Sequence, residues 1–389
     1  MKSQARIFVL VACVLAACSR DGRESARSHS SAGYDSARAA ADKPLNLYAA
    51  TGAGALSPEA ARAIPLVYVP NSLSASVTII DPTSYRVLRT VPVGAVPQHV
   101  APSYDLRTLW VTNNRGNSLT PIDPTTGREG ERVPVVDPYN LYFTPDGRYA
   151  LVIAEERGRF DVRDPHTMTL IRSVPVECKG LNHVDFTADN RYAIATCEFS
   201  GELVKLDMST WKPVVYRALE PRGSQKKSMP QDIRAAPDGR VFYVVDMMAD
   251  GIYLIEPDSL RSTGFIPTGR GAHGIITGRE GRVFYVTNRG WHRITGGRRG
   301  PGSISVFDPM TQTVVATWPV PGGGSPDMGN LTADGRELWV AGRYDEEVYV
   351  FDTATGRMTH RIEVGREPHG VVVWPQPGRF SLGHTGNMR

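Results

Sequence analysis

The feature that most constrains this sequence is a short apolar strand ending in an acidic residue, which recurs seven times. The seven copies occupy residues 77–81, 119–123, 160–164, 203–207, 252–256, 304–308 and 348–352. Their final acids are 42, 41, 43, 49, 52 and 44 residues apart. Seven repeats of this length are typical of a β-propeller, a ring of antiparallel sheets called blades. We therefore predict an all-β, seven-bladed propeller of four-stranded antiparallel blades over residues 65–389.

Turn signals divide each repeat into four strands. In the third repeat, four apolar stretches lie at residues 141–143, 149–154, 160–163 and 169–176, and the first two are separated by Pro145-Asp146-Gly147. Proline presets φ and glycine accepts positive φ, so this tripeptide predicts a tight turn. The chain has 38 Gly and 29 Pro among 389 residues, which excludes a helical bundle, and its 41% apolar content is enough for a large core.

One strand motif resembles that of a known family. Residues 285–288 read Tyr-Val-Thr-Asn, and variants stand at 110–113 (Trp-Val-Thr-Asn) and 68–71 (Tyr-Val-Pro-Asn). With this motif the chain resembles the YVTN family of β-propellers over roughly residues 65 to 380. The resemblance implies the fold and says little about activity, because propellers host enzymes, binding modules and scaffolds alike.

The two ends of the repeat region predict how the ring closes. The last repeat ends with an apolar stretch at residues 370–374 that no further blade follows, and the first repeat begins at residue 66 with what resembles a second strand. We predict that residues 370–374 supply the missing inner strand of the first blade, so that no sheet edge stays open. The tail, residues 380–389, would then lie over this seam.

The N-terminal residues predict an exported protein. A short basic start precedes the apolar run at residues 7–17, which is typical of a signal peptide. The run ends Leu-Ala-Ala-Cys18, which resembles the lipobox of bacterial lipoproteins, where the cysteine is lipidated; the alternative is an ordinary signal with an incidental cysteine. We predict a lipoprotein signal peptide over residues 1–18 and a flexible tether over residues 19–64. The alternative to a fully flexible tether is an ordered arm through residues 46–48. The protein would be located in the bacterial cell envelope, on its periplasmic or outer surface.

Polar residues recur where each innermost strand begins, at the mouth of the predicted channel. They are His99, Asn140, His183, Asp232, His273, Asp327 and His369. The first four precede the acid of their own repeat by 24 residues. Counted back from the hairpin turns, the last three lie one residue earlier than the first four. A one-residue shift reverses the facing of a strand residue unless a bulge absorbs it. We predict a polar funnel for a small polar ligand, with local structural capping as a further alternative.

Imidazole and carboxylate groups also suit a divalent transition metal such as Zn, Cu, Fe or Ni. The candidate ligands are His99, His183, His273 and His369, of which one ion could reach a subset. The Pro-Gln-His sequence at residues 97–99 resembles the lactonase propellers related to 6-phosphogluconolactonase. A second resemblance, to the cytochrome d1-haem propellers, implies that His183 would lie near the macrocycle, although the chain has no Cys-x-x-Cys-His haem motif.

Two cysteines remain in the predicted propeller, Cys178 and Cys197. The predicted hairpin brings both to one end, close to His183. A disulfide is the leading prediction for an exported protein. Two free thiols, or a thiolate and imidazole metal site with His183, are the alternatives.

Two long insertions on the mouth face carry basic residues. They are Arg222, Lys226, Lys227, Arg293, Arg298 and Arg299. They would form a basic rim for an anionic ligand, a lipid headgroup or a cell-wall polymer; the alternative is a pair of solvated loops. The formal charge of the whole chain is only +4, which does not favour nucleic acid.

Phosphate-binding glycine loops, Gly-x-Ser-x-Gly and His-Glu-x-x-His are absent from the sequence. We therefore predict a monomeric, membrane-anchored propeller that binds a ligand or an envelope protein at the channel mouth without established catalysis. The alternative is an enzyme: a metal-dependent or lactonase-like hydrolase or oxidoreductase that uses the funnel histidines, or a d1-haem-related binding protein.

Overall fold

The computed structural model describes residues 44–223 and 225–389. The predicted leader, Cys18 and the predicted tether up to residue 43 lie outside the described residues. The helices within the described ranges are three 3₁₀ turns, η1 (Ala60–Arg62), η2 (Ser72–Ser74) and η3 (Arg279–Gly281). None of them is long or apolar enough to cross a membrane.

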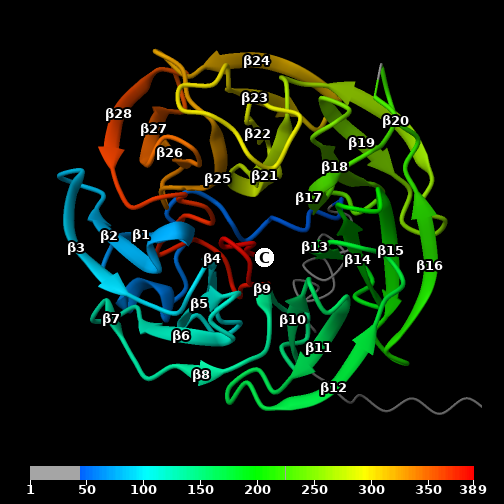
Figure 1. Cartoon of the computed structure of the whole chain (residues 1–389), viewed down its shortest axis with the longest axis horizontal. Helices are drawn as coiled ribbons and strands as arrows, with labels where there is room; N and C mark the ends of the chain where they lie inside the picture. Colours follow the sequence, from blue (N-terminus) through cyan, green and yellow to red (C-terminus); the bar gives the residue numbers. More distant parts are fainter. Residues whose placement is uncertain (1–43, 224) are drawn as a thin grey trace, which may run out of the picture. The chain divides into compact units, whose positions relative to one another are not determined.

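Seven antiparallel sheets surround a central channel and confirm the predicted seven-bladed propeller (Figure 1). From the channel outwards, the first blade consists of β29 (Val372–Trp374), β1 (Leu66–Asn71), β2 (Ser76–Asp81) and β3 (Arg86–Pro92). The second consists of β4 (Pro97–Pro102), β5 (Leu109–Asn113), β6 (Ser118–Asp123), β7 (Arg128–Glu129) and β8 (Val133–Pro134). The third consists of β9 (Pro138–Phe143), β10 (Ala150–Ala154), β11 (Arg159–Arg163) and β12 (Leu170–Pro175).

The other four blades each have four strands. They are β13 (Leu181–Phe186), β14 (Tyr192–Cys197), β15 (Glu202–Asp207) and β16 (Lys212–Ala218); β17 (Pro230–Ala235), β18 (Phe242–Asp246), β19 (Gly251–Ile255) and β20 (Ser262–Pro267); β21 (Ala272–Thr277), β22 (Phe284–Asn288), β23 (Ser303–Asp308) and β24 (Thr313–Pro319); and β25 (Pro326–Leu331), β26 (Glu337–Gly342), β27 (Glu347–Asp352) and β28 (Met358–Glu363).

The second blade departs from four strands because its outer strand is broken into β7 and β8, which both pair with β6. The break lies opposite Pro121, in the middle of β6. Proline has no N–H to donate to the ladder. On this side Pro121 contributes its carbonyl oxygen, which accepts a hydrogen bond from Gly130 N at 2.8 Å.

The ring closes as predicted. β29 pairs antiparallel with β1, with Leu66 opposite Trp374, Val67 opposite Val373 and Tyr68 opposite Val372. The chain end therefore supplies the innermost strand of the first blade. A closed ring removes the open sheet edge that would otherwise invite pairing with another chain.

The core lies between blades. Seven clusters of buried apolar side chains occupy the seven contacts between neighbouring blades. For example, β10 is an unbroken apolar strand, buried along its whole length, because its blade is covered on both faces. The outermost strand of the same blade, β12, is mostly exposed.

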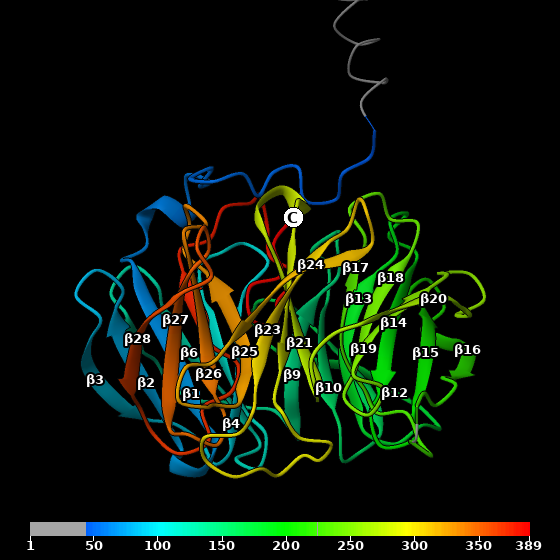
Figure 2. The same cartoon turned by 90° about the horizontal axis from the view of Figure 1, so that it is seen from above.

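The strand directions define two faces of the ring. Innermost strands begin at the mouth face, and the first hairpin turn of each blade lies at the opposite, far face. The described part of the predicted tether, from Leu45, packs on the far face (Figure 2). Leu47 N donates to Pro237 O at 2.8 Å, and the buried Tyr48 donates its hydroxyl to Ala235 O at 2.7 Å.

The predicted flexible tether is therefore wrong for residues 45–64, and the alternative of an ordered arm through residues 46–48 holds. Burying the Tyr48 ring against Phe284 stabilises the arm by about 2 kcal/mol, which offsets part of the entropy cost of fixing it.

The prediction for the C-terminal tail was also wrong. Instead of covering the seam, residues 379–389 form a hairpin in which Ser381 pairs with Met388. Its turn enters the channel from the far face beside β9, where Phe143 N donates to Leu382 O and His384 N to Leu141 O. Figure 1 shows the C-terminus beside the channel axis.

Candidate functional site

A β-bulge near the start of the innermost strands redirects the side chains that form the channel site. In β13, Leu181 pairs with Cys197 and Val184 with Ala195, so Asn182 and His183 together lie opposite Thr196. Register shifts occur at the corresponding place in β4, β9, β17, β21 and β25. A bulge of this kind redirects side chains without ending the strand.

The threonine of the Tyr-Val-Thr-Asn motif, or Thr196 at the equivalent place in β14, stabilises the bulge. Thr196 Oγ1 accepts a hydrogen bond from His183 N at 3.1 Å, and Thr112 and Thr287 do the same for His99 N and Gly274 N. Gly274 thus stands where His99 and His183 stand in their blades. His273 lies one residue earlier, as the spacing predicts, and the bulge absorbs the shift.

The structure brings all seven predicted channel residues together. Their side chains form one network of contacts that runs from His273 through Asp327, His369 and His99 to His183, where Asn140 and Asp232 join. Every one of them is at most 2% exposed. The arrangement is a buried cluster and not the open funnel that the sequence suggests.

Asp327 organises one half of the cluster. His369 Nδ1 donates to its Oδ2 at 2.6 Å, and His273 Nδ1 lies 2.7 Å from its Oδ1. Arg289 donates to Oδ1 through Nε and Nη2 at 2.9 and 2.7 Å. Burial alone would raise the pKa of Asp327, but Arg289 and the two histidines outweigh it and hold the pKa well below its usual range.

Asp232 organises the other half. Arg234 Nη1 donates to its Oδ1 at 2.6 Å, and His183 Nδ1 lies 3.8 Å from the same oxygen. His384 Nε2 lies 3.6 Å from Oδ2. Burial opposes ionisation here too, but Arg234 and then the two imidazoles lower the pKa of Asp232.

His384 is the functional candidate that sequence reasoning missed. It lies outside the repeats, so no equivalent position in another blade pointed to it. The Gly-His-Thr-Gly sequence at residues 383–386 signalled a tight turn, but not that the turn would enter the channel. Burial lowers the pKa of His384 and of the four predicted channel histidines; the values are about 4 for His273 and about 3 for His369. All five imidazoles are therefore neutral at pH 7.

The four predicted metal ligands do not gather around one point. Among the described residues, the ligand atoms close enough to share an ion belong to His183, Asp232 and His384, all within 4.8 Å of one another. His99 packs beside this group, with ring centroids 5.6 Å from His183 and 4.9 Å from His384. His273 and His369 are instead held by Asp327.

Tyr139 covers the histidines on the mouth side. Its ring centroid lies 5.5 Å from that of His99 and 6.2 Å from that of His183, and the residue is 8% exposed. A haem macrocycle could reach His183 only if Tyr139 or the tail moved. The structure therefore has no open site for a haem at His183, the residue to which the resemblance to d1-haem propellers points.

Two acids lie at the mouth, the buried Glu198 and the half-buried Glu155, each directly after the second strand of its blade. Burial raises the pKa of Glu198 to about 7, although Arg289 and Asn182 lower it in part. Burial, helped by the neighbouring Glu198, raises the pKa of Glu155 to about 8. Glu155 also lines a surface pocket with Lys179 and Phe199. The motif analysis did not single out these acids.

The six predicted rim residues are exposed on the mouth face, but several have partners. Arg299 forms two 2.8 Å hydrogen bonds with Glu347, and Arg298 lies 3.7 Å from Glu346. Arg222 lies over the Phe265 ring and Arg293 over the Trp291 ring, while Lys227 donates to a backbone carbonyl. The rim is therefore less positive than its sequence suggests.

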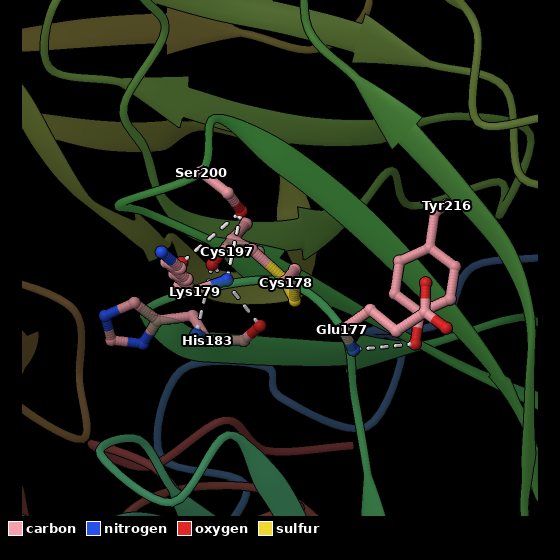
Figure 3. The surroundings of a disulfide bond; sticks show 8 residues. Glu177, Cys178, Lys179, His183, Cys197, Ser200 and Tyr216 are labelled. Atoms are coloured by element: carbon pink, nitrogen blue, oxygen red, sulfur yellow. Dashed lines mark hydrogen bonds between the residues drawn. A yellow bond between two sulfur atoms is a disulfide. The ribbon is translucent and has the colours of Figure 1, made fainter.

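Cys178 and Cys197 form a disulfide, with an S–S distance of 2.03 Å. It joins the start of the fourth blade to the end of β14 and is buried. Figure 3 shows the His183 imidazole turned away from the two sulfur atoms. A thiolate site shared with His183 is therefore not formed.

Comparison with known proteins agrees with this architecture. Residues 43–378 match the model of the YNCE-like β-propeller family. No curated protein matches the sequence.

Several solved structures share the fold. A protein of unknown function from Desulfotomaculum acetoxidans has a TM-score of 0.63 and 14% identity, covering 80% of this chain and 99% of its own. A putative 6-phosphogluconolactonase from Bacteroides uniformis has a TM-score of 0.59 and 20% identity, covering 79% and 98%. The dihydro-heme d1 dehydrogenase NirN, in complex with DHE, has a TM-score of 0.58 and 16% identity, covering 81% and 75%. At these identities the likeness shows the propeller fold alone.

Proposed function

Because this chain belongs to the YNCE-like β-propeller family, we propose that it is an exported, lipid-anchored propeller that binds a small polar ligand in its central channel without catalysing a reaction. One observation carries the proposal. Apart from His273 Nδ1, which lies 2.7 Å from Asp327 Oδ1, five ring nitrogens in the channel are buried and have no hydrogen-bond partner among the described protein atoms: His99 Nδ1 and Nε2, His183 Nε2, His369 Nε2 and His384 Nε2. Buried polar atoms nearly always have partners, so these nitrogens call for a bound ligand or ordered water.

Within the channel cluster, as distinct from Glu198 and Glu155 at the mouth, the protonation states favour binding over catalysis. Arginines keep the carboxylates of Asp232 and Asp327 ionised, and burial keeps the histidines neutral. A general acid or base works best when its pKa lies near the operating pH, and these groups are held far from it. The lactonase-like alternative rests on fold likeness and on the Pro-Gln-His sequence at residues 97–99, and the d1-haem alternative on fold likeness and the place of His183.

Export and anchoring are supported by the apolar run at residues 7–17, the Leu-Ala-Ala-Cys18 sequence and the disulfide. Disulfides persist in oxidising compartments, and lipid chains on Cys18 would give stable membrane attachment. Cell fractionation of the full chain and of Cys18→Ser tests this part. Wild-type protein in the membrane fraction and release of the variant into the soluble envelope fraction would support anchoring. Equal distribution of the two proteins would rule it out.

Native mass spectrometry of the full chain, extracted gently from membranes, tests the binding role. We expect the folded protein to be heavier than the denatured chain by the mass of one ligand. The excess should be lost in His99→Gln and kept in His166→Gln, because His99 lies in the channel whereas the side chain of His166 is 72% exposed. A folded wild-type protein with no excess mass would contradict the proposal.

A further inference from the structure

Three side chains from three separate segments meet on the far side of Tyr139. His183 lies on β13, Asp232 on β17 and His384 at the turn of the C-terminal hairpin. Their ligand atoms all lie within 4.8 Å of one another, and the three residues are at most 1% exposed. Two imidazoles and one carboxylate are a donor set used by zinc and by ferrous iron.

The carboxylate has capacity for one more partner. Asp232 Oδ1 accepts hydrogen bonds from Arg234 and from Ile233 N. Its Oδ2 accepts one hydrogen bond, from Ile275 N at 3.1 Å, and faces His384. An ionised carboxylate oxygen has about two acceptor sites, so Oδ2 keeps one lone pair on the side of the two histidines.

The imidazoles are oriented by a shared neighbour. The Asn140 amide nitrogen lies 3.0 Å from His384 Nδ1 and 3.3 Å from His183 Nδ1. Asn140 Oδ1 accepts a hydrogen bond from Leu141 N at 2.9 Å, so the amide presents its nitrogen to both rings. A histidine that binds an ion through Nε2 carries its proton on Nδ1, so the amide would turn its oxygen to that ring when the ion binds. Nε2 of both rings is buried without a partner among the described residues. His384 presents Nε2 to Asp232, whereas the His183 nitrogen that lies 3.8 Å from Asp232 is Nδ1.

The backbone conformation of the tail turn places the His384 ring in the channel. His384 has a φ of 49°, in the left-handed region that costs a non-glycine residue about 1 kcal/mol or more. Gly383 before it lies so close to β9 that a Cβ would meet Leu141 O at 2.4 Å. The hairpin therefore holds an unfavourable conformation that aims an imidazole at Asp232.

We infer that His183, Asp232 and His384 bind one divalent first-row transition-metal ion, and that the bound ion fastens the C-terminal tail inside the channel. The inference names the ligand class of the proposed channel function and rests on that function. Because the ligands come from the fourth blade, the fifth blade and the tail, a bound ion links all three. The tail then gains stability with metal, and removal of metal loosens it.

The test uses the full chain without a histidine tag, dialysed against a chelator and titrated with Co²⁺ and then Zn²⁺. We expect one Co²⁺ per chain, visible as absorption in the range of cobalt bound by nitrogen and oxygen ligands, and its displacement by Zn²⁺. Hydrogen exchange of residues 379–389 should slow at least tenfold when Zn²⁺ is bound.

Matched variants separate this site from adventitious binding. His183→Gln and His384→Gln should each weaken Co²⁺ binding at least tenfold, whereas His166→Gln should leave it unchanged. His384→Gln replaces a ring at the tail turn and leaves all seven blades intact, so it keeps the test meaningful if His183→Gln fails to fold. Unchanged binding in His384→Gln would overturn the inference.

The same measurements distinguish failure of the inference from failure of the proposed function. If the wild-type chain binds no Co²⁺ or Zn²⁺ but carries an organic ligand in native mass spectra, the metal inference falls and the channel-binding function stands. If it carries neither, both fall. Metal binding that does not slow exchange in the tail would refute the fastening role.

Discussion

The last residue of the chain forms an ion pair with an innermost strand: Arg389 Nη2 lies 2.8 and 2.9 Å from the two carboxylate oxygens of Asp185. Asp185 lies on β13, two residues after His183, and both partners of the pair are buried. The guanidinium also lies 4.5 Å from the Tyr48 ring centroid, on the N-terminal arm. The two ends of the described chain therefore meet at the far end of the channel.

We predict that Arg389→Ala lowers the free energy of unfolding by about 3 kcal/mol, because it leaves the Asp185 carboxylate buried without its cation. Arg379→Ala is the control, since that arginine is exposed on the same tail. Denaturant unfolding of both variants measures the difference. Equal stability of the two variants would show that the pair contributes little.

Two truncations should separate the tail from the closing strand. A chain ending at residue 378 keeps β29 and should fold with reduced stability. A chain ending at residue 367 loses β29, exposes the inner edge of β1 and should be insoluble. Solubility and circular dichroism measure both. A soluble, folded chain ending at 367 would contradict the role of β29 in closing the ring.

Glu198 should make stability fall as pH rises. Its pKa is about 7 in the folded protein and 4.5 when unperturbed. Between these values the unfolded chain loses its proton while the folded chain keeps it, so the free energy of unfolding should decrease by about 3 kcal/mol from pH 4.5 to pH 7 through this group and then level off.

Glu198→Gln should remove this part of the pH dependence. Melting temperatures of the wild type and the variant between pH 4.5 and 8.5 provide the measurement, and Glu131→Gln, at an exposed site, is the control. Parallel curves for wild type and Glu198→Gln would show that Glu198 titrates normally.

The disulfide should stabilise the fourth blade. It spans 19 residues of sequence, and closing a loop of this size restricts the unfolded chain by about 3 kcal/mol. We expect Cys178→Ala/Cys197→Ala to lower the melting temperature and a reductant to shift the wild type toward the variant. A reductant that also shifts the variant would point to a different cause.

The repeat made the fold predictable. A short apolar strand that ends in an acid recurs seven times, with tight turns between the strands, and each of these signals acts within a few residues of sequence. Closure through residues 370–374 followed from counting strands, since the first repeat lacks an innermost strand and the last supplies one too many. The seven channel residues were found for the same reason, because equivalent positions in a ring converge on its axis.

The parts outside the repeats could not be predicted in this way. The arm at residues 45–64 looks like a polar linker, and only the fit of Tyr48 against the fifth and sixth blades makes it ordered. The tail has a turn signal at residues 383–386, but its destination depends on the space between β9 and the channel axis. The arm and the tail lie outside the repeats, so the periodicity of the sequence carries no information about their contacts.

The number of blades, the closing strand and the residues at the innermost strands follow from the amino-acid sequence, because periodic patterning and turn chemistry act locally. Only the tertiary structure decided that His384 joins His183 and Asp232, that Arg389 pairs with Asp185 and that the channel is closed rather than open. His384 lies 152 positions from Asp232 in the sequence, and Arg389 lies 204 positions from Asp185. These contacts form because the closed ring leaves a channel lined by polar side chains along its axis, which the ends of the described chain fill.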